Sequence, residues 1–349
     1  MKTVTVNAST EYDILIDSGI LDKTGKIVKE KFGLNKICII TDDVVDGLYG
    51  ERTVNSFKKQ DFNVEKIVIQ HGEQSKNTEN LIYIVRKLAK MNFTRNDMLV
   101  ALGGGVVGDL CGFCAATYMR GIRFIQMPTT LLAAVDSSVG GKCAVDLPEG
   151  KNLFGAFWQP SLVICDTDTL KTLTKEIYAD GCAEIIKYGM IYDKNLFEMV
   201  KSGVFDHSEV IARCVQIKRD IVNQDEFDTG LRQILNFGHT FGHGIEILSA
   251  FKVSHGMGVA IGMSIITNAL KNAGLIDESV YNELVDTLKN NNLPTNYSCS
   301  PSELFEKVIV DKKRVGECIN VILVKAIGQS EICKMELDKV NELIKIGIN

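Results

Sequence analysis

Three of the chain's five histidines lie in one short stretch, and this grouping is the clearest sign of chemistry in the sequence. His239 and His243 are four residues apart, so on one helix they share a face, and His255 follows after a loop. Two such histidines with a third nearby resemble a metal site whose remaining ligand comes from elsewhere. Thr240 stands where a HExxH metalloprotease would carry its general-base glutamate, which disfavours that class. The alternative is hydrogen-bonded histidines packed in a glycine-lined contact between helices.

A carboxylate that could complete the site lies in the segment CAEIIKYG, which has a helical pattern. Its Glu184 is the candidate oxygen ligand. Lys187 follows three residues later and projects from the same helix face. On spacing alone, such a Glu–Lys pair is usually a solvated salt bridge, and that is the structure we expect for it.

A glycine-rich loop forms a second candidate site. In LVALGGGVVGDLCGF, Gly103, Gly105 and Gly108 have the G-x-G-x-x-G spacing after a strand and before a helix, where backbone N–H groups can approach a pyrophosphate. A tight strand-to-helix turn without a ligand also favours glycine. The next strand ends without an acidic residue for a ribose, and the nearest such residue is Asp42, upstream. The loop therefore binds a nucleotide in a variant topology or binds something else.

Basic residues gather near these segments although the chain as a whole is acidic. Each one alone is typical of an ordinary surface charge, but together they suit a substrate that carries phosphate or carboxylate. They are Arg120, Lys142, Lys151, Lys187, Lys218 and Arg232.

The predicted secondary structure that positions these groups differs between the two halves of the chain. In the first half, aliphatic and β-branched runs precede polar or glycine-rich turns, which predicts parallel strands joined by helices. These runs begin at Lys36, Val64, Asp97, Ile122 and Leu162. After about Asp166 the pattern becomes helical. We expect two domains, 1–165 (α/β) and 166–349 (all-helical), with the ligand site in the cleft between them.

The composition excludes several classes of protein. The chain has 349 residues, 45% hydrophobic and 24% charged, which is typical of a globular protein. A net charge of −5 argues against a nucleic-acid-binding surface. The N-terminal stretch alternates like a strand and lacks a signal peptide's apolar centre, and no apolar run is long enough for a membrane span. We expect a soluble, cytoplasmic protein that binds neither nucleic acid nor membrane.

The ten cysteines are scattered through apolar segments, which is typical of buried free thiols rather than disulfides. Cys111 and Cys114 form a CxxC in a helix-like run. No second CxxC completes a zinc site, so packing is the favoured interpretation.

Taken together, four long segments resemble the 3-dehydroquinate synthase family of sugar phosphate cyclases. The likeness follows the order of the chain and spans nearly all of it. The segments are GGGVVGDLCGFCAATYMRGIRFIQMPTTLLAAVDSSVGGKCAVDLPEGKNLFGAFWQP from Gly103, GCAEIIKYGMI from Gly181, GLRQILNFGHTFGHGIE from Gly230 and SHGMGVAIGM from Ser254.

The resemblance implies an N-terminal Rossmann-like NAD-binding α/β domain and an all-α C-terminal domain with one divalent metal, zinc or cobalt. It implies conversion of 3-deoxy-D-arabino-heptulosonate 7-phosphate to 3-dehydroquinate and phosphate, step 2 of the shikimate pathway. The steps are transient oxidation by NAD, phosphate elimination, reduction and intramolecular aldol closure. A homodimer is expected from the same resemblance.

The resemblance also implies roles for individual residues. Three protein ligands would leave positions open at the ion for a substrate oxygen. These ligands would be Glu184, His239 and His255. His243 would face the substrate instead, and Asp42 would bind the ribose hydroxyls. The other substrate contacts would be Arg120, Asp136, Lys142, Asn152, Lys187, Lys218, Arg232 and Asn236. The other NAD contacts would be Glu73, Lys76, Gly104, Gly105, Val106, Asp109, Thr129, Thr130, Lys142, Lys151 and Thr172.

A few positions depart from the family pattern, and three alternatives stay open. Asp228 stands where the family usually has glutamate, Val44 where some members have asparagine, and either lysine of the DKK segment at Asp311 could reach the substrate. The alternatives are another sugar phosphate cyclase, a metal-dependent polyol or alcohol dehydrogenase of related fold, and a non-catalytic metal-stabilised binding protein.

Overall fold

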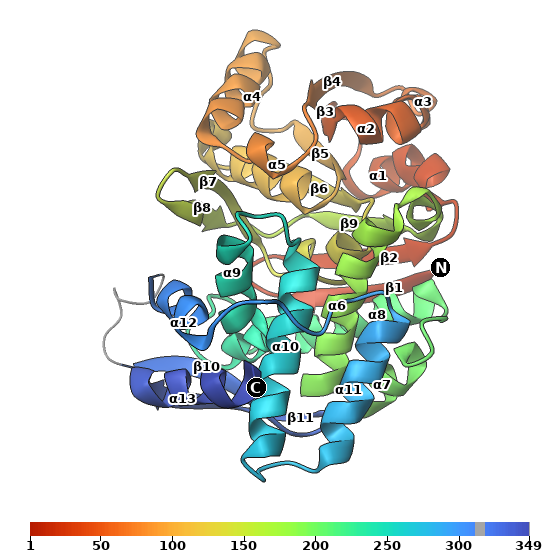
Figure 1. The fold of residues 1–349 in the computed structure, drawn as a ribbon. Helices are drawn as coiled ribbons and strands as arrows, with labels where there is room; N and C mark the ends of the chain where they lie inside the picture. Colours follow the sequence, from red (N-terminus) through yellow and green to blue (C-terminus); the bar gives the residue numbers. More distant parts are fainter. Residues whose placement is uncertain (311–317, 349) are drawn as a thin grey trace. The chain divides into compact units, whose positions relative to one another are not determined.

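The fold is described from a computed structural model, over residues 1–310 and 318–348 (Figure 1). Contacts between residues divide the chain into two compact units. The first comprises Met1–Leu173 and Lys218–Glu226, and the second comprises Thr174–Ile217 and Phe227–Asn349. Because Lys218–Glu226 belongs with the first unit, a single cut in the sequence does not separate the two.

A seven-stranded sheet forms the centre of the first unit, with the order β1-β2-β9-β6-β5-β3-β4. Its strands are β1 (Lys2–Asn7), β2 (Glu11–Asp17), β3 (Lys36–Asp42), β4 (Asn63–Ile69), β5 (Met98–Gly103), β6 (Arg123–Pro128) and β9 (Leu162–Asp166). All neighbouring strands are parallel except β1 and β2, which form an antiparallel pair. The five parallel strands predicted from their aliphatic runs are confirmed. The N-terminal stretch, expected to be one strand, folds as two.

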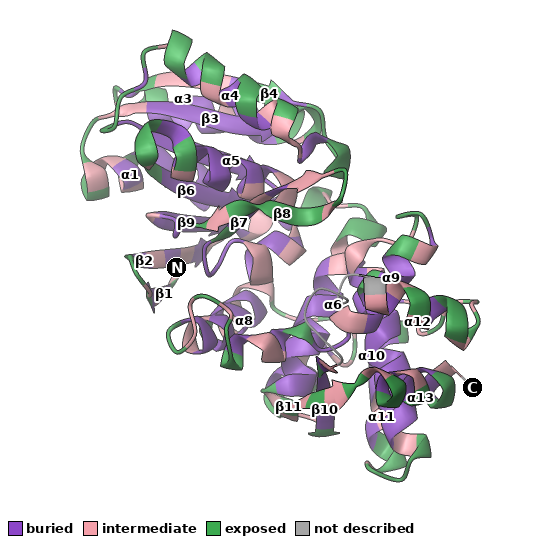
Figure 2. Ribbon diagram, turned by 90° about the vertical axis from the view of Figure 1, so that its left-hand side faces the viewer, coloured by how far each residue is buried: buried purple, intermediate pink, exposed green. Residues whose placement is uncertain are grey.

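Helices cover both faces of this sheet. They are α1 (Thr24–Phe32), α2 (Asp43–Val45), α3 (Glu51–Lys58), α4 (Thr78–Lys90) and α5 (Gly105–Thr117). Successive side chains of a strand point to opposite faces. In β3, Cys38 and Ile40 join the core beneath α4 and α5, whereas Ile37 and Ile39 join the core beneath α1 and α3. The central strands β3, β5, β6 and β9 are accordingly almost wholly buried, whereas β1, β2 and β4 include exposed residues. Exposed residues also lie on the outer faces of the helices (Figure 2).

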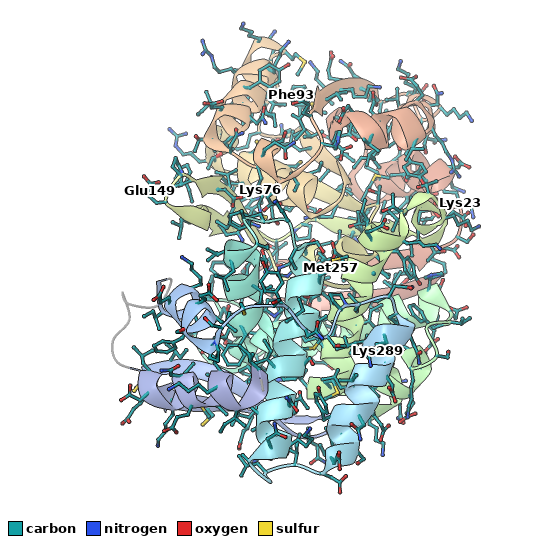
Figure 3. The ribbon with its side chains drawn as sticks, in the orientation of Figure 1. Lys23, Lys76, Phe93, Glu149, Met257 and Lys289 are labelled. Carbon is teal, nitrogen blue, oxygen red and sulfur yellow. The ribbon has the colours of Figure 1, made fainter. Side chains whose placement is uncertain are left out.

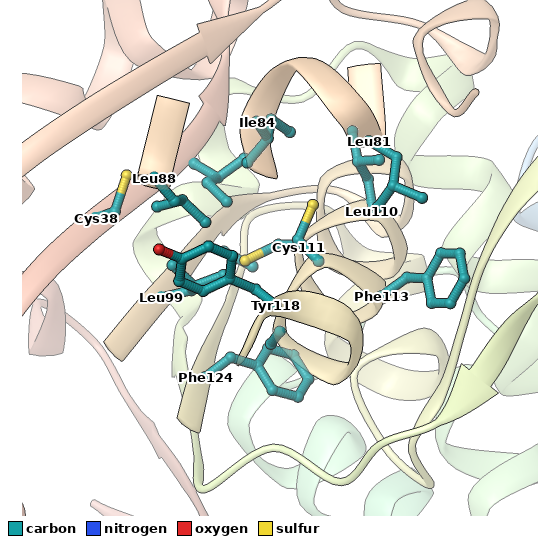
Figure 4. Close-up of a cluster of buried hydrophobic side chains, with 14 of the residues drawn as sticks. Cys38, Leu81, Ile84, Leu88, Leu99, Leu110, Cys111, Phe113, Tyr118 and Phe124 are labelled. Carbon is teal, nitrogen blue, oxygen red and sulfur yellow. The ribbon is translucent and has the colours of Figure 1, made fainter. Parts of the chain in front are cut away.

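The CxxC pair lies inside the first of these cores. Cys111 and Cys114 are fully buried in the same cluster as Leu110, Phe113 and Phe124 (Cys111 and these three are labelled in Figure 4). Burial raises the pKa of both thiols. A buried thiol with a raised pKa is a poor nucleophile and a poor metal ligand. The packing interpretation is therefore confirmed, and all ten cysteines are free.

A separate antiparallel hairpin also belongs to the first unit. It consists of β7 (Lys142–Leu147) and β8 (Gly150–Phe157). Asp146 N donates to the carbonyl of Lys76 at 2.8 Å, so the hairpin is held against the loop that follows β4. Short helical turns complete the unit: η1 (Ile20–Lys23), η2 (Asp46–Gly50), η3 (Glu73–Ser75), η4 (Tyr118–Arg120), η5 (Ala133–Ser137) and η6 (Thr167–Thr172).

The second unit is mainly helical, as predicted. Its central helix, α10, packs against α6, α9, α11 and α13, and its run of small and aliphatic residues is almost wholly buried. The helices are α6 (Lys175–Ile191), α7 (Lys194–Val200), α8 (His207–Val222), α9 (His239–Leu248), α10 (His255–Asn272), α11 (Glu278–Asn290), α12 (Pro301–Val310) and α13 (Leu337–Ile348), with a 3-10 turn, η7 (Leu231–Asn236). The end of α8, from Lys218 on, is grouped with the first unit.

The second unit also contains a feature that the sequence analysis did not predict. Two strands, β10 (Cys318–Ala326) and β11 (Gln329–Glu336), form an antiparallel ribbon.

In the parts of the chain that are described, no helix is both long enough and apolar enough to cross a membrane.

Candidate functional site

Three potential metal ligands from three helices converge in the second unit. Glu184 lies within α6, His239 is the first residue of α9, and His255 is the first residue of α10. The Nε2 atoms of His239 and His255 each lie 3.5 Å from the same oxygen, Oε1 of Glu184. One carboxylate oxygen and two imidazole nitrogens within 4.8 Å of one another form a donor set that suits zinc or cobalt.

Glycines allow the two histidine-bearing helices to approach each other. A Cβ on Gly262 would lie 2.0 Å from the carbonyl oxygen of Gly238, and one on Gly242 would lie 2.7 Å from that of Gly258. No side chain fits at these distances, so α9 and α10 touch through their backbones. The glycine-lined helix contact considered in the sequence therefore exists, and it brings the histidines together.

A carboxylate on α6 holds the start of α10. Asp180, one turn before Glu184, accepts a hydrogen bond from Ser254 Oγ at 2.5 Å. A Cβ on Gly256 would lie 2.4 Å from the Cα of Asp180, so these two helices also meet through their backbones. The helix that carries Glu184 thus sets the position of His255.

The second nitrogen of each candidate histidine ligand faces an acceptor. His239 Nδ1 lies 3.2 Å from the carbonyl oxygen of Phe237, and His255 Nδ1 lies 3.1 Å from Oε1 of Glu246. A proton on each Nδ1 leaves both Nε2 lone pairs directed toward Glu184. Metal-binding histidines commonly have this arrangement, so the residues fit a divalent ion.

The charges around the two histidines differ, and so do their pKa values. Burial lowers the pKa of His239 to about 3. Loss of solvent also lowers that of His255, but the carboxylates of Glu184 and Glu246 outweigh it and raise its pKa to about 10. The site therefore favours one positive charge between these carboxylates.

His243 lies beside this cluster on the exposed side of α9. Its ring centroid is 5.6 Å from that of His239 and 5.8 Å from that of His255. His243, Glu246 and His255 form a second group whose donor atoms lie within 4.8 Å of one another. The geometry is therefore compatible with two roles for His243: it could bind the metal itself, or it could lie beside the residues that do.

Lys187 corrects one expectation from the sequence. Its ammonium pairs with Glu184, but the side chains are 2% and 1% exposed, so the pair is buried rather than solvated. The i, i+3 spacing could not reveal this, because burial depends on the helices packed around α6. Arg232, on η7, is also buried at 2% exposure, whereas Asn236 at the end of η7 is exposed.

In the first unit, the glycine loop lies where parallel strands end. Gly103 ends β5 opposite Pro128 of β6, and α5 begins at Gly105. A Cβ on Gly104 would lie 3.1 Å from the methyl group of Thr130, so the loop approaches the end of β6 closely. Asp42 ends β3 at the same edge of the sheet and caps α2 by accepting from Val45 N at 2.8 Å. The candidate ribose and pyrophosphate contacts thus share one edge.

Next to this loop, buried charges link α5 to the β7–β8 hairpin. Lys76 Nζ lies 2.6 Å from Asp109 Oδ2 and donates to Asn152 Oδ1 at 2.6 Å (Lys76 is labelled in Figure 3). Asn152 has a positive φ of 57°, and its N–H donates to Asp146 at 2.8 Å. Asp146 therefore holds the backbone of Asn152, and Lys76 holds its side chain.

The remaining candidates of the first unit are more dispersed. Lys218 forms a largely buried ion pair with Asp136 at 2.8 Å, and Lys151 lies 3.8 Å from Glu73 at the surface. Thr172 Oγ1 lies 2.6 Å from the hydroxyl of Tyr49. The other candidates lie along these segments: Val106 in the first turn of α5, Thr129 directly after β6, and Lys142 as the first residue of β7.

Arg120 is not placed with the other candidates of the first unit. It precedes the start of β6 at Arg123, whereas Thr129 and Thr130 follow its end. Six strand residues separate the two edges by about 20 Å. Two other sequence candidates, Lys312 and Lys313, lie outside the described residues.

The structure also identifies residues that the sequence analysis missed. Glu246 and Asp146 each form a hydrogen bond with a candidate site residue, and Asp180 accepts one from Ser254, next to His255. Only Glu246 had a signal in the sequence, because it is three residues after His243 and seven after His239, on the same helix face.

Comparison with known proteins agrees with this arrangement. The family models for the 3-dehydroquinate synthase N-terminal and C-terminal regions match residues 66–180 and 181–314. The 3-dehydroquinate synthase of Clostridium acetobutylicum is 43% identical over 355 residues, which cover 99% of this chain and 100% of that protein.

Two solved structures share the fold. One is 2-deoxy-scyllo-inosose synthase with carbaglucose-6-phosphate, NAD+ and Co2+, at a TM-score of 0.89 and 23% identity over 99% of this chain and 100% of that one. The other is ValA, a 2-epi-5-epi-valiolone synthase from Streptomyces hygroscopicus with NAD+ and Zn2+, at 0.88 and 24% over 98% of each chain. The predicted fold class is confirmed, and the chain belongs to the 3-dehydroquinate synthase family.

Proposed function

We propose that this protein is a 3-dehydroquinate synthase, a carbon–oxygen lyase of the shikimate pathway that makes 3-dehydroquinate and phosphate from 3-deoxy-D-arabino-heptulosonate 7-phosphate. The convergence of Glu184, His239 and His255 carries the proposal, because it occurs in a chain 43% identical to a 3-dehydroquinate synthase over its whole length. The sequence resemblance reached the same conclusion from the motifs alone.

We assign NAD to the first unit and one zinc or cobalt ion to the second. The solved relatives carry NAD+ with Co2+ or Zn2+. Glu184, His239 and His255 would hold the ion. The cofactor would be held by Asp42, Glu73, Lys76, Gly104, Gly105, Val106, Asp109, Thr129, Thr130, Lys142, Lys151 and Thr172.

The bound ion would lower the cost of forming an alkoxide, and NAD would accept and return the hydride. The residues of the chain have a different task, which is to keep one substrate in one orientation through several steps. Fixed cations achieve this by pairing with the phosphate and carboxylate. We assign this role to Lys142, Lys187, Lys218 and Arg232, with hydrogen bonds from Asp136, Asn152 and Asn236. Arg120 is left out of this assignment, because within one chain it lies at the opposite edge of the sheet.

His243 is the proposed residue for proton handling. Its ring is exposed beside the ligand cluster, and imidazole is the side chain most often used to give or take a proton in catalysis. We assign it to the substrate rather than to the ion.

The deciding experiment is incubation with the heptulosonate phosphate, NAD and zinc or cobalt. We expect equal amounts of phosphate and 3-dehydroquinate, identified by mass, without net NADH. Steady accumulation of NADH would instead indicate a polyol or alcohol dehydrogenase. Turnover of glucose 6-phosphate in preference to the heptulosonate phosphate would indicate a different cyclase, and metal binding without any turnover would indicate a binding protein.

We also expect the protein to form a homodimer, which the family resemblance implies. We expect it to be located in the cytoplasm, as the sequence composition indicates. Light scattering coupled to gel filtration measures the first, and cell fractionation measures the second. A mass of 38.5 kDa in solution, that of one chain, would contradict the dimer.

A further inference from the structure

We infer that Glu246 is a positioning residue for His255. Its carboxylate keeps the proton of the imidazole on Nδ1, so that Nε2 is the nitrogen that binds the metal. This inference rests on the proposed function, because it takes Glu184, His239 and His255 as the ligands.

The geometry places two carboxylates at opposite nitrogens of one ring. Glu246 Oε1 lies 3.1 Å from Nδ1 of His255, and Glu184 Oε1 lies 3.5 Å from Nε2. Both carboxylates are buried, at 5% and 1% exposure. In such surroundings each requires a partner, because an unpaired buried charge is costly. Glu184 pairs with the ammonium of Lys187, and Glu246 faces Nδ1 of His255. A ring with its proton toward Glu246 gives that carboxylate a donor and leaves the Nε2 lone pair on the side of Glu184 Oε1, where the metal would bind.

The chemistry of imidazole makes the two nitrogens unequal. A neutral ring has one N–H donor and one lone pair, and the hydrogen bond at one nitrogen decides which nitrogen can bind a metal. A carboxylate acceptor also makes the opposite nitrogen a better donor to the metal. Among the described residues, the acceptor at Nδ1 of His239 is the neutral carbonyl of Phe237, whereas His255 has a carboxylate there.

The packing of α9 against α10 provides the space for this carboxylate. A Cβ on Gly258 would lie 3.2 Å from Cγ of Glu246, which is closer than most side chains tolerate. Glu246 thus lies against bare backbone of α10, one turn from His255. Its position is determined by the same glycine contact that brings the histidines together.

The competing interpretation is that Glu246 is itself a ligand. His243, Glu246 and His255 also place their donor atoms within 4.8 Å of one another. That group would use Nδ1 of His255 and would leave Glu184 and His239 without a metal. The two interpretations therefore predict opposite effects for variants of the two groups.

The test is calorimetric titration of the metal-free protein with Co2+. In Glu246→Gln, we expect Co2+ affinity to fall by about 10–100-fold, with an altered visible spectrum of the bound ion, since a neutral amide supports the ring less. Glu278→Gln, at an exposed position of α11, is the matched control and should bind as the wild type does. Thermal melting without metal reports whether each variant is folded. Because Gln is nearly the same size as Glu, we expect the substitution to preserve the packing.

Co2+ affinity of Glu246→Gln within twofold of the wild type would overturn the inference, as would an unchanged spectrum. Loss of binding in Glu246→Gln and His243→Ala, with binding retained in Glu184→Gln, would also overturn it, because Glu246 would then be a ligand. A wild-type protein that binds no Co2+ would refute the proposed metal itself, which is a separate failure.

Discussion

The ammonium of Lys76 lies 2.6 Å from the carboxylate of Asp109, and only 5% of Lys76 is exposed. Burial raises the pKa of Asp109, and the charge of Lys76 lowers it in part. The same ammonium donates to Asn152, a proposed substrate contact. One buried ion pair therefore connects a proposed cofactor contact on α5 to a proposed substrate contact on β8.

Replacing Lys76 should test this connection. Lys76→Met leaves the largely buried Asp109 carboxylate, 18% exposed, without this cation, and breaking such a pair typically costs up to about 3–5 kcal/mol. We expect a loss of that size in the free energy of unfolding measured in urea, with weaker NAD binding by fluorescence titration.

The double variant Lys76→Met with Asp109→Asn is the control, because it removes both charges. We expect it to recover a large part of the lost stability. A single variant within 1 kcal/mol of the wild type would show that the pair carries little stability.

The division of roles among the histidines predicts different metal contents. Glu184→Ala, His239→Ala and His255→Ala should each lose bound zinc and activity together, because each removes a ligand. His243→Ala should keep the metal and lose most turnover. Metal content after dialysis, measured by mass spectrometry of the ions, separates the two groups. Equal metal loss in all four variants would refute this division.

The glycine contact between α9 and α10 predicts a strong effect of a single methyl group. In Gly262→Ala the new Cβ would lie 2.0 Å from a backbone oxygen of Gly238, so the helices must separate. Overpacking of this kind costs about 1–3 kcal/mol or more, and it should reduce metal affinity by moving His239 from His255. Chemical denaturation and Co2+ titration measure the two effects.

Gly47→Ala is the matched control, since no atom lies within 4 Å of the Cβ it would add. We expect its stability to stay within about 1 kcal/mol of the wild type, with unchanged Co2+ binding. If Gly262→Ala behaved in the same way, α9 and α10 would not be in backbone contact.

An ion pair between α7 and α8 predicts a pH dependence of stability. Burial raises the pKa of Asp193, but Arg213 and the N–H groups of Leu196 and Asn195 lower it more, so its net pKa is below the ordinary value. An acid whose folded pKa is depressed stabilises the fold above its unfolded pKa of about 4. That stability is lost as the pH falls through the folded pKa.

Asp193→Asn isolates this effect, because Asn caps a helix about as well as Asp. We expect it to lower the unfolding free energy by up to about 1 kcal/mol at pH 7, with the difference from the wild type shrinking below about pH 4. Urea unfolding at several pH values measures it. Arg213→Met should give a similar loss, and a difference that is constant with pH would contradict the mechanism.

Much of the first unit could be predicted from local patterns. β3, β5, β6 and β9 are runs of aliphatic residues, and such runs form strands buried on both faces. The G-x-G-x-x-G turn follows β5 because glycine permits close backbone approach there. These properties depend on residues near one another in the chain, so the order of residues is sufficient to predict them.

Other features could not be predicted, because they depend on distant segments. The spacing of Glu184 and Lys187 is the same for a solvated pair and for a buried one, and packing around α6 decides between them. The ribbon of β10 and β11 was missed although residues 321–324 form a buried aliphatic run, because the run lies in a half of the chain whose pattern is mainly helical. Asp180 acts on the start of α10, which lies more than seventy residues further along the chain.

The sequence by itself determined the types of donor atom, their helical spacing and the family to which the chain belongs. Only the tertiary structure decided which nitrogen of His255 faces Glu184, which faces Glu246, and how Asp180 holds α10 in place. The physical reason is that metal-binding geometry requires atoms from three helices to meet within a few ångströms. Backbone contacts at glycines set those distances, and no local pattern of residues records them.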